Sequence, residues 1–312
     1  MMKDMIKFHY NIEIDKIEQQ NDEYYFQKNE NYFFMYPFFR STKELEDIYQ
    51  ICQELKKMSI PVHTFILNKE NKLITQINDT NYILLKAEEN PNKEYNIIDI
   101  RNIENSLHLL KNKSDLYRNQ WGELWSKKID YFEYQIRELG KEKKVVLNSL
   151  TYYIGLAENA ISYVNNTIQK ANIPNGYTIT LSHKRIHFPN FSKDYLNPLT
   201  FIFDLKIRDV VEYIKKAFFI NEKEAWIEIK AYLDAEYLTQ FEYQMLFGRL
   251  LYPSYYFDIY EQIMNKQASE EELIPYIRKA KDYEIFLNKI FIEISKKSSI
   301  EKIDWLSKEK ML

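Results

Sequence analysis

Residues 181–204 read LSHKRIHFPNFSKDYLNPLTFIFD, with a polar segment between two short apolar runs. The polar segment contains two histidines, two prolines and two asparagines, and the run TFIFD that follows it alternates as strands do. Polar residues with a proline between two apolar runs are typical of a loop, and loops carry a large share of binding and catalytic residues. The stretch therefore predicts a loop that bears a functional site.

The two histidines allow two interpretations. His183 and His187 have the i, i+4 spacing of a helical zinc pair, but no glutamate follows His183 and Pro189 interrupts any helix. Zinc is therefore disfavoured, and we expect no metal. The other interpretation is that both imidazoles hold the loop backbone through hydrogen bonds, which either charge state allows.

The spacing of His183, Arg185, His187 and Asn190 resembles the catalytic loop of the aminoglycoside phosphotransferase and choline kinase-like branch of the protein-kinase fold. That loop reads His-Gly-Asp-x-His-x-x-Asn. Its Asp accepts the proton of the substrate hydroxyl and its Asn holds a metal ion at the nucleotide phosphates. The resemblance implies an α+β, two-lobed fold, with a small antiparallel β lobe carrying one helix and a large, mainly α-helical lobe.

The departures from that pattern predict a degenerate site. Arg185 replaces the Asp, and a guanidinium stays protonated and offers only donors, so it cannot act as a base. Lys184 replaces the Gly. A second metal-binding Asp is expected at the end of the next strand, where Thr200 or Asp204 stands, and alignment on the helix IRDVVEYI favours Thr200. We therefore expect no catalytic residue among the loop positions.

Residues 1–88 predict the β-rich lobe. Its strands are expected at IKFHYNIEI (6–14), EYYFQKN (23–29), YFFMYPF (32–38), HTFILN (63–68), KLITQI (72–77) and NYILLKA (81–87). A helix is expected over residues 41–58, with Ser41 and Glu44 as a capping box and Pro61 after its end.

This lobe lacks the parts that bind ATP. A phosphate loop needs glycine so that backbone amides can approach the phosphates, yet the first glycine is Gly122. Met35 stands about where the phosphate-binding lysine is expected, and a thioether cannot replace an ammonium. Glu44 and Glu46 are candidates for the helix carboxylate that pairs with this lysine, although capping and solvation explain them more simply. We expect no cofactor.

Residues 89–312 predict a helical lobe that carries the loop 181–204, after a hinge near Pro91. Helical spacing of apolar residues marks 101–113, 115–139, 145–171, 207–219, 223–238, 242–264 and 270–297. Trp121 and Trp125 are expected to face one core, and His108 to be a core or edge residue. The segment 171–177 should turn the chain into the strand before the loop, and Pro253 should kink or separate two helices.

The composition excludes several classes of partner. The 43 basic and 46 acidic residues are well mixed, so we expect no nucleic-acid partner. The single cysteine, Cys52, cannot form an internal disulfide. The N-terminus lacks the pattern of a signal peptide, and no apolar run approaches membrane-spanning length. The sequence therefore predicts a protein that folds in the cytosol.

A second resemblance rests on four stretches, residues 44–88, LSHKRIHFPNF (181–191), IRDVVEYI (207–214) and LLYPSYYFDIYE (250–261). Together they are similar to the YutH-like endospore coat-associated proteins of the spore coat protein S family. The resemblance implies synthesis in the mother-cell cytoplasm of a sporulating bacterium, then association with the spore coat and with other spore coat proteins. It implies no activity.

Three functions remain open from the sequence. The leading hypothesis is a pseudokinase with a structural or interaction role in spore formation. The alternative is an ATP-dependent small-molecule phosphotransferase that uses magnesium, with Asp204 or Asp209 in a carboxylate role, although Asp209 is more simply favoured by a helix N-terminus. The third is an inactive module that senses nucleotide.

Overall fold

The computed structural model describes residues 2–20, 22–107, 114–139, 142–171 and 179–307. Contacts divide the chain into two compact units. Unit 1 comprises Met1–Tyr117 and Thr180–Phe203, and unit 2 comprises Arg118–Ile179 and Asp204–Leu312. Residues 89–117 and most of the loop stretch are thus grouped with the N-terminal residues, and the boundary predicted near residue 89 stays a prediction.

Unit 1 is built on an antiparallel sheet with the strand order β1-β2-β3-β6-β4, to which β5 adds by pairing with β6. Its strands are β1 Glu18–Gln20, β2 Glu23–Lys28, β3 Asn31–Pro37, β4 Thr64–Ile66, β5 Thr75–Ile77 and β6 Thr80–Lys86. Strands β2 to β6 coincide with five of the six segments that the sequence predicts as strands. Strand β1 lies outside these segments and follows the sixth, residues 6–14. The α+β class is confirmed.

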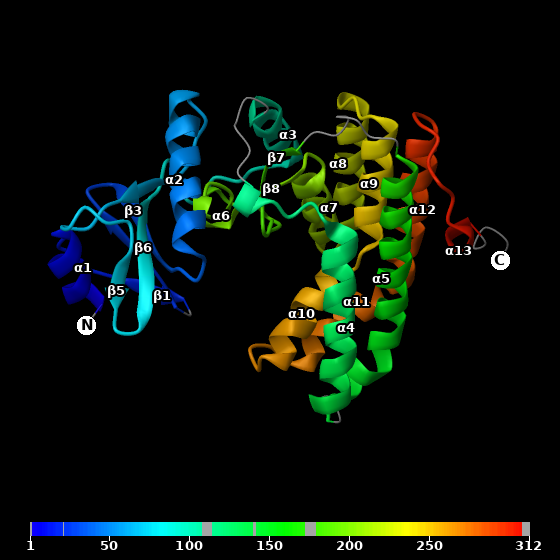
Figure 1. The fold of residues 1–312 in the computed structure, drawn as a ribbon, viewed down its shortest axis with the longest axis horizontal. Helices are drawn as coiled ribbons and strands as arrows, with labels where there is room; N and C mark the ends of the chain where they lie inside the picture. Colours follow the sequence, from blue (N-terminus) through cyan, green and yellow to red (C-terminus); the bar gives the residue numbers. More distant parts are fainter. Residues whose placement is uncertain (1, 21, 108–113, 140–141, 172–178, 308–312) are drawn as a thin grey trace. The chain divides into compact units, whose positions relative to one another are not determined.

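The two faces of this sheet are covered by different helices (Figure 1). Helix α1, Met2–Tyr10, packs on the face that carries Met35 and Leu84. Helix α2, Thr42–Lys57, lies on the opposite side of the sheet, where Tyr49 contacts the ring of Phe65 at 5.6 Å. Because side chains alternate along a strand, successive residues of β3 face different helices.

The strand predicted over residues 6–14 is wrong, because its first half belongs to α1. Ile6 and Tyr10, one helical turn apart, are buried against the sheet. The Tyr10 hydroxyl and Thr75 Oγ1 are 2.8 Å apart and share a hydrogen bond. The helix covers apolar residues of β3 and β6 that would otherwise face water.

The predicted helix after β3 is confirmed as α2, including its capping box. Ser41 Oγ accepts a hydrogen bond from Glu44 N at 3.2 Å, and the Glu44 carboxylate accepts one from Ser41 N at 3.3 Å. Cys52 lies on the inward face of this helix and is 1% exposed. Burial raises the pKa of its thiol, so the thiolate that reacts with oxidants is disfavoured.

The remaining elements of unit 1 lie in the loop stretch or in residues 97–116. They are α3 Ile97–Ser106, η2 Ser114–Leu116, α6 Ser192–Tyr195 and η3 Pro198–Thr200. Strands β7, Ile179–His183, and β8, Phe201–Leu205, pair with each other, and the division into units cuts both strands near one end. The predicted helix over 101–113 is shifted toward the N-terminus, and His108 lies outside the described residues.

Unit 2 is mainly helical in its described residues, as predicted. Its helices are α4 Trp121–Leu139, α5 Lys144–Lys170, α7 Arg208–Ile220, α8 Glu222–Ala235, α9 Gln240–Leu251, α10 Ser254–Met264, η4 Glu270–Leu273, α11 Ile274–Arg278, α12 Ala280–Ser295 and α13 Asp304–Ser307. Trp121 and Trp125 stack in one core with ring centroids 5.6 Å apart, and Pro253 separates α9 from α10, which confirms both predictions. All of the predicted turn at 171–177 except Ala171 lies outside the described residues.

Helices α5 and α9 approach closely at Gly248, and this contact gives a stability prediction. A Cβ at Gly248 would lie 2.7 Å from Val164 Cγ2 and 3.1 Å from Tyr163 Cδ1, whereas a Cβ at Gly155 meets nothing within 4 Å. Gly248→Ala should therefore lower the free energy of unfolding by about 1–2 kcal/mol, because overpacking exceeds the gain in helix propensity.

The matched variant Gly155→Ala should raise the unfolding free energy by about 0.5–1 kcal/mol, because alanine restricts the unfolded chain and favours the helix. Urea unfolding followed by circular dichroism measures both. Equal signs for the two variants would contradict the close approach of α5 and α9 at Gly248.

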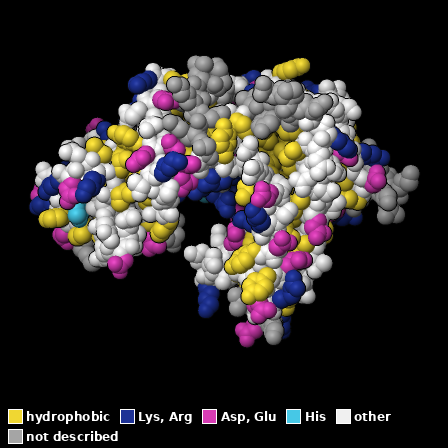
Figure 2. Space-filling model, in the orientation of Figure 1, with side chains coloured by type: hydrophobic (Ala, Val, Ile, Leu, Met, Phe, Trp, Pro, Cys, Tyr) yellow, Lys and Arg dark blue, Asp and Glu magenta, His cyan; other side chains and the backbone are white. Residues whose placement is uncertain are grey.

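The surface carries both signs of charge. Acidic and basic side chains are interspersed on both units in the face that Figure 2 shows. No helix in the described ranges is long and apolar enough to cross a membrane.

Candidate functional site

His183 ends β7 and is buried inside unit 1. Its Nε2 donates a hydrogen bond to the carbonyl oxygen of Tyr195 at 2.8 Å, and its ring lies 4.6 Å from the Tyr195 ring. The imidazole thus connects the start of the loop to α6. This geometry agrees with the interpretation that His183 holds the loop backbone.

Arg185 and His187, the next two positions of the predicted pattern, are exposed on the loop. Arg185 Nη1 donates to the carbonyl oxygen of its neighbour Lys184 at 3.2 Å, and Lys184 N donates to Thr200 O at 2.8 Å. Residues 184–190 contain no carboxylate. At the position of the family's Asp, a substrate hydroxyl would therefore meet a cationic donor instead of a carboxylate base.

Asn190 is the position that matches the metal-binding Asn, and it is 1% exposed. Its backbone carbonyl accepts a hydrogen bond from Tyr95 N at 2.7 Å, but neither atom of its side-chain amide has a hydrogen-bond partner among the described residues. Magnesium requires several hard oxygen ligands, and one amide oxygen does not supply them. Within the described ranges, no three His, Cys, Asp or Glu side chains are placed to hold a metal ion.

The side chain of Thr200, the favoured counterpart of the metal-binding Asp, forms a local hydrogen bond. Its Oγ1 donates to Asn197 O at 2.9 Å, within the turn η3 that precedes β8. A threonine hydroxyl bonded in this way adds no charge to the site. The residues present therefore do not fit a magnesium-nucleotide site.

Asp204, the other carboxylate candidate, is fully buried and already bonded within unit 2. Trp121 Nε1 donates to its two oxygens at 2.8 and 3.0 Å, and Leu205 N donates to Oδ1 at 2.7 Å. Arg208 forms an ion pair with Oδ2. With donors on both oxygens and a guanidinium beside it, the carboxylate has a structural role and is not available as a base.

A second buried carboxylate extends this charged cluster. Glu212 Oε1 lies 2.8 Å from Lys215 Nζ and 2.9 Å from Arg249 Nε. Burial would raise the pKa of Glu212, but Lys215, Arg249 and Arg208 outweigh burial and lower it. Burial lowers the pKa of Lys215 to about 8, against the opposing effect of Glu212.

We call the group Asp204, Arg208, Glu212, Lys215 and Arg249 the buried charge cluster. The Arg249 guanidinium lies over the Trp121 ring, 4.4 Å from its centroid, and Lys215 Nζ also donates to Ser254 Oγ at 2.6 Å. Every charge in the cluster thus has a partner, which offsets the cost of removing it from water. The cluster joins α7 to α9 and to the start of α4.

Met35 does not lie where a phosphate-binding lysine belongs. A lysine that pairs with a carboxylate on α2 has to face α2, but Met35 is packed in the core under α1. Phe34 and Tyr36 occupy the face of β3 opposite to Met35 and are 3% and 7% exposed. Their rings stack at 5.9 Å, and burial raises the pKa of Tyr36. Aromatic rings thus fill the position of the expected ammonium.

Of the two candidate α2 carboxylates, Glu44 is engaged elsewhere and Glu46 is exposed. Glu44 caps α2 and pairs with Arg40 Nη2 at 3.0 Å. Arg40 Nη1 also donates to Phe201 O at 2.8 Å and to Leu199 O at 3.2 Å, so it ties the start of α2 to β8. The i, i+4 spacing of Arg40 and Glu44 is the only signal of this pair in the sequence.

His63 is a second anchor of the loop that the sequence does not reveal. Its Nδ1 accepts from Glu88 N at 3.3 Å, so Nε2 carries the proton and donates to Lys193 O at 3.3 Å. Its backbone N donates to Leu196 O at 3.0 Å. Burial lowers the pKa of His63 to about 4, so the imidazole is neutral near pH 7.

The connection between β1 and β2 leaves no room for a phosphate loop. Gln20 pairs with Glu23, so the connection between the two strands is two residues long in the sequence. In phosphotransferases of the kinase fold, a glycine-rich loop covers the nucleotide phosphates. Here an aspartate and a glutamate stand at the turn, and their charge repels phosphate.

The fold is that of the aminoglycoside phosphotransferases and their kinase-like relatives. The structure of an aminoglycoside phosphotransferase from Alicyclobacillus acidocaldarius matches with a TM-score of 0.64 and 9% identity, over 92% of this chain and 94% of that chain. A spectinomycin phosphotransferase matches with a TM-score of 0.58 and 13% identity, over 89% and 93%. A microcompartment-associated aminopropanol kinase matches with a TM-score of 0.59 and 12% identity, over 95% and 97%.

Sequence comparison identifies the family within this class. The family model described as "Spore coat putative kinase YutH" matches residues 3–290, so the chain belongs to that family. The endospore coat-associated protein YutH of Bacillus subtilis is 29% identical over 99% of both chains. The kinase-like fold and the spore-coat family that the sequence indicates are thus confirmed.

Proposed function

We propose that this kinase-like spore coat protein transfers no phosphate and acts as a structural or interaction component of the coat. The observation that carries the proposal is Arg185, which stands where the phosphotransferases keep the proton-accepting Asp, on a loop segment without any carboxylate. Aromatic rings at Phe34 and Tyr36 support it, because a phosphate-binding lysine is missing from that face of β3. The bonded state of Asp204 supports it further.

The proposal extends to cofactors, partners and location. We expect neither ATP nor magnesium to be required, because aromatic rings replace the phosphate-binding lysine and Thr200 replaces the metal-binding Asp. The family implies association with the endospore coat, and we propose other coat proteins as partners, reached after synthesis in the mother-cell cytoplasm.

Thermal unfolding with ATP tests the binding half of the proposal. We expect the melting temperature to stay unchanged by ATP, with or without magnesium, because a ligand stabilises a protein only if it binds the folded state. A ligand at 100 times its Kd adds about 2.7 kcal/mol, so binding is easily detected. Magnesium-dependent stabilisation would instead indicate the phosphotransferase, and metal-independent stabilisation a nucleotide sensor.

Restoring the base tests the catalytic half. The variant Arg185→Asp should not hydrolyse ATP or phosphorylate small alcohols, because the lysine and the metal carboxylate are missing as well. Turnover by this variant would mean that the rest of the site is intact. Turnover by the wild-type protein would refute the proposal outright.

A further inference from the structure

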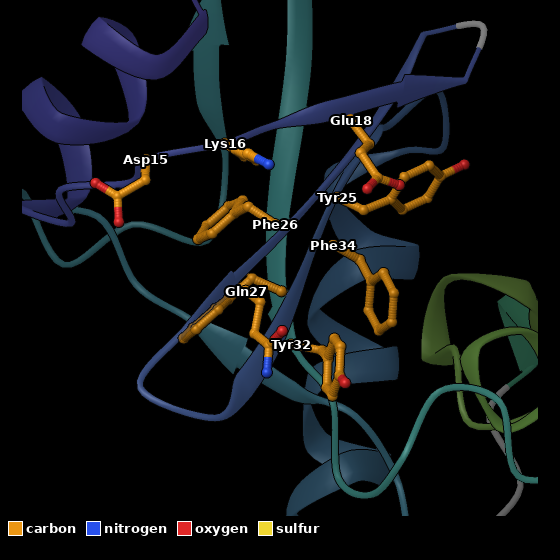
Figure 3. Close-up of a pocket in the computed structure, with 9 residues that line it drawn as sticks. Asp15, Lys16, Glu18, Tyr25, Phe26, Gln27, Tyr32 and Phe34 are labelled. Atoms are coloured by element: carbon orange, nitrogen blue, oxygen red, sulfur yellow. The ribbon is translucent and has the colours of Figure 1, made fainter.

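A groove of about 470 Å³ lies along the outer edge of β2 in unit 1 (Figure 3). The segment Asp15–Glu18 forms one wall, and side chains of β2 and β3 form the other. A groove of this size is within the range of specific binding sites. Its lining residues all belong to unit 1.

The backbone of β2 is incompletely paired at this edge. Strand β1 covers β2 only from Glu23 to Tyr25, and in the described part of the chain no strand pairs with the outer side of Phe26–Lys28. Lys28 and Asn31 close the two-residue turn to β3, so their backbones are hydrogen-bonded to each other. Along an antiparallel pair of strands, hydrogen-bonded and non-hydrogen-bonded residue pairs alternate, so the next pair, Gln27 and Tyr32, is not hydrogen-bonded. Gln27 therefore directs its N–H and C=O outward, away from β3.

The hydrogen bonds of β3 agree with this register. Tyr32 pairs with Gln27, and its carbonyl accepts from Ala87 N at 2.8 Å, on the β6 side. Tyr32 therefore bonds away from β2, and the backbone groups of Gln27 have no partner in β3. The side chain of Gln27 is exposed.

The groove contacts both faces of the sheet. On one face, the rings of Phe26 and Phe33 stack with centroids 5.0 Å apart and line the groove with the small part of their surface that is exposed, 5% and 9%. On the other face, Tyr25 and Tyr32 present rings with polar ends. An extended chain sends alternate side chains to opposite faces, so it matches a groove that runs around a strand edge.

The rim of the groove sets the charge of the occupant. Asp15 and Glu18 line it with two carboxylates, against the single ammonium of Lys16. Lysine or arginine side chains on the occupant would therefore be attracted to this wall. The groove is suited to a segment that alternates between apolar and basic residues.

We propose that the outer edge of β2 binds an extended segment of a partner protein as an added strand, with alternating apolar and basic side chains and a backbone pairing at Gln27. The proposal rests on the interaction role proposed above. It fails separately from the catalytic half, because its test measures peptide binding in the absence of nucleotide.

A proline substitution at Gln27 tests the backbone pairing separately from the side chains. Gln27→Pro removes one outward N–H and no bond to β3, so the sheet should tolerate it, and Gln27→Ala is the matched control that keeps the N–H. A displayed library of random linear heptapeptides is selected in parallel on the wild-type protein and both variants. We expect the wild-type protein and Gln27→Ala to enrich peptides with alternating apolar and basic residues, and Gln27→Pro not to enrich them.

An enriched peptide, labelled with fluorescein, is then measured by fluorescence anisotropy. We expect about a tenfold loss of affinity in Gln27→Pro, the size of one lost hydrogen bond, and none in Gln27→Ala. The double variant Asp15→Lys, Glu18→Lys leaves the backbone intact and should also lose at least tenfold. This second variant keeps the test decisive if the proline variant does not fold.

Three results would overturn the proposal. The first is that selection enriches no common pattern, and the second is that Gln27→Pro binds the enriched peptide as tightly as the wild-type protein. The third is a concentration-dependent dimer in light scattering that Gln27→Pro abolishes, which would make a second copy of this chain the occupant.

Discussion

Asp204→Asn should lower the free energy of unfolding by about 3–5 kcal/mol, the usual cost of removing one partner from a buried ion pair. The amide keeps the size of the side chain but leaves the Arg208 guanidinium, whose side chain is 11% exposed, without the carboxylate that pairs with it. It also places an NH₂ group against donors such as Trp121 Nε1. Urea unfolding followed by tryptophan fluorescence measures the loss.

Asp130→Asn is the matched control for this variant, because Asp130 lies on the exposed side of α4. Its effect should stay within about 0.5 kcal/mol, as for most surface substitutions. Magnesium should not rescue Asp204→Asn or stabilise the wild-type protein, because arginine already neutralises the carboxylate. A loss below about 1 kcal/mol would contradict the structural role of Asp204.

Acidification should destabilise the protein through His63, by roughly 3 kcal/mol between neutral pH and pH 4. In the unfolded chain, His63 has its ordinary pKa of 6.5 and binds a proton below that pH. In the folded chain its pKa is about 4, so it binds a proton only near pH 4. The unfolded state thus binds more protons in this window. The contribution of the neutral His63 to stability is fully present above pH 6.5 and is lost as the pH falls toward 4.

Urea unfolding at several pH values between 7 and 4 tests this dependence. The variant His63→Asn has no imidazole to protonate, so its stability should fall less steeply over this window, whatever its stability at pH 7. Carboxylates contribute to both slopes and cancel in the difference. Parallel slopes for the wild-type protein and His63→Asn would refute the assignment.

The sequence predicts the helices and most strands because their apolar periods are long and unambiguous. The exception is α1, where Ile6, Phe8 and Tyr10 alternate as a strand would. Nine residues are too few to separate the two periods, and Ile6 and Tyr10 also satisfy helical spacing. Packing on the sheet decides between helix and strand, because α1 covers apolar side chains on one face of the sheet. This tertiary contact is not visible in the local sequence.

Only part of the candidate site can be predicted from the sequence, because the rest depends on tertiary contacts. The loss of the base is visible at Arg185, because residue type alone decides it. The sequence places Met35 near the lysine position, one residue from those that face α2, and a shift of one position in a strand exchanges the faces. The partners of Asp204 include Trp121 and Arg249, which lie far away in the chain and follow no local pattern.

The buried position of Cys52 has a practical consequence for work on this protein. It is the chain's single thiol, and its location inside α2 shields it from maleimide dyes and similar reagents. A cysteine introduced at an exposed residue, such as Lys16 beside the β2 groove, would then be the one site that a dye modifies. The natural chain thus serves as its own cysteine-free background for site-specific fluorescence.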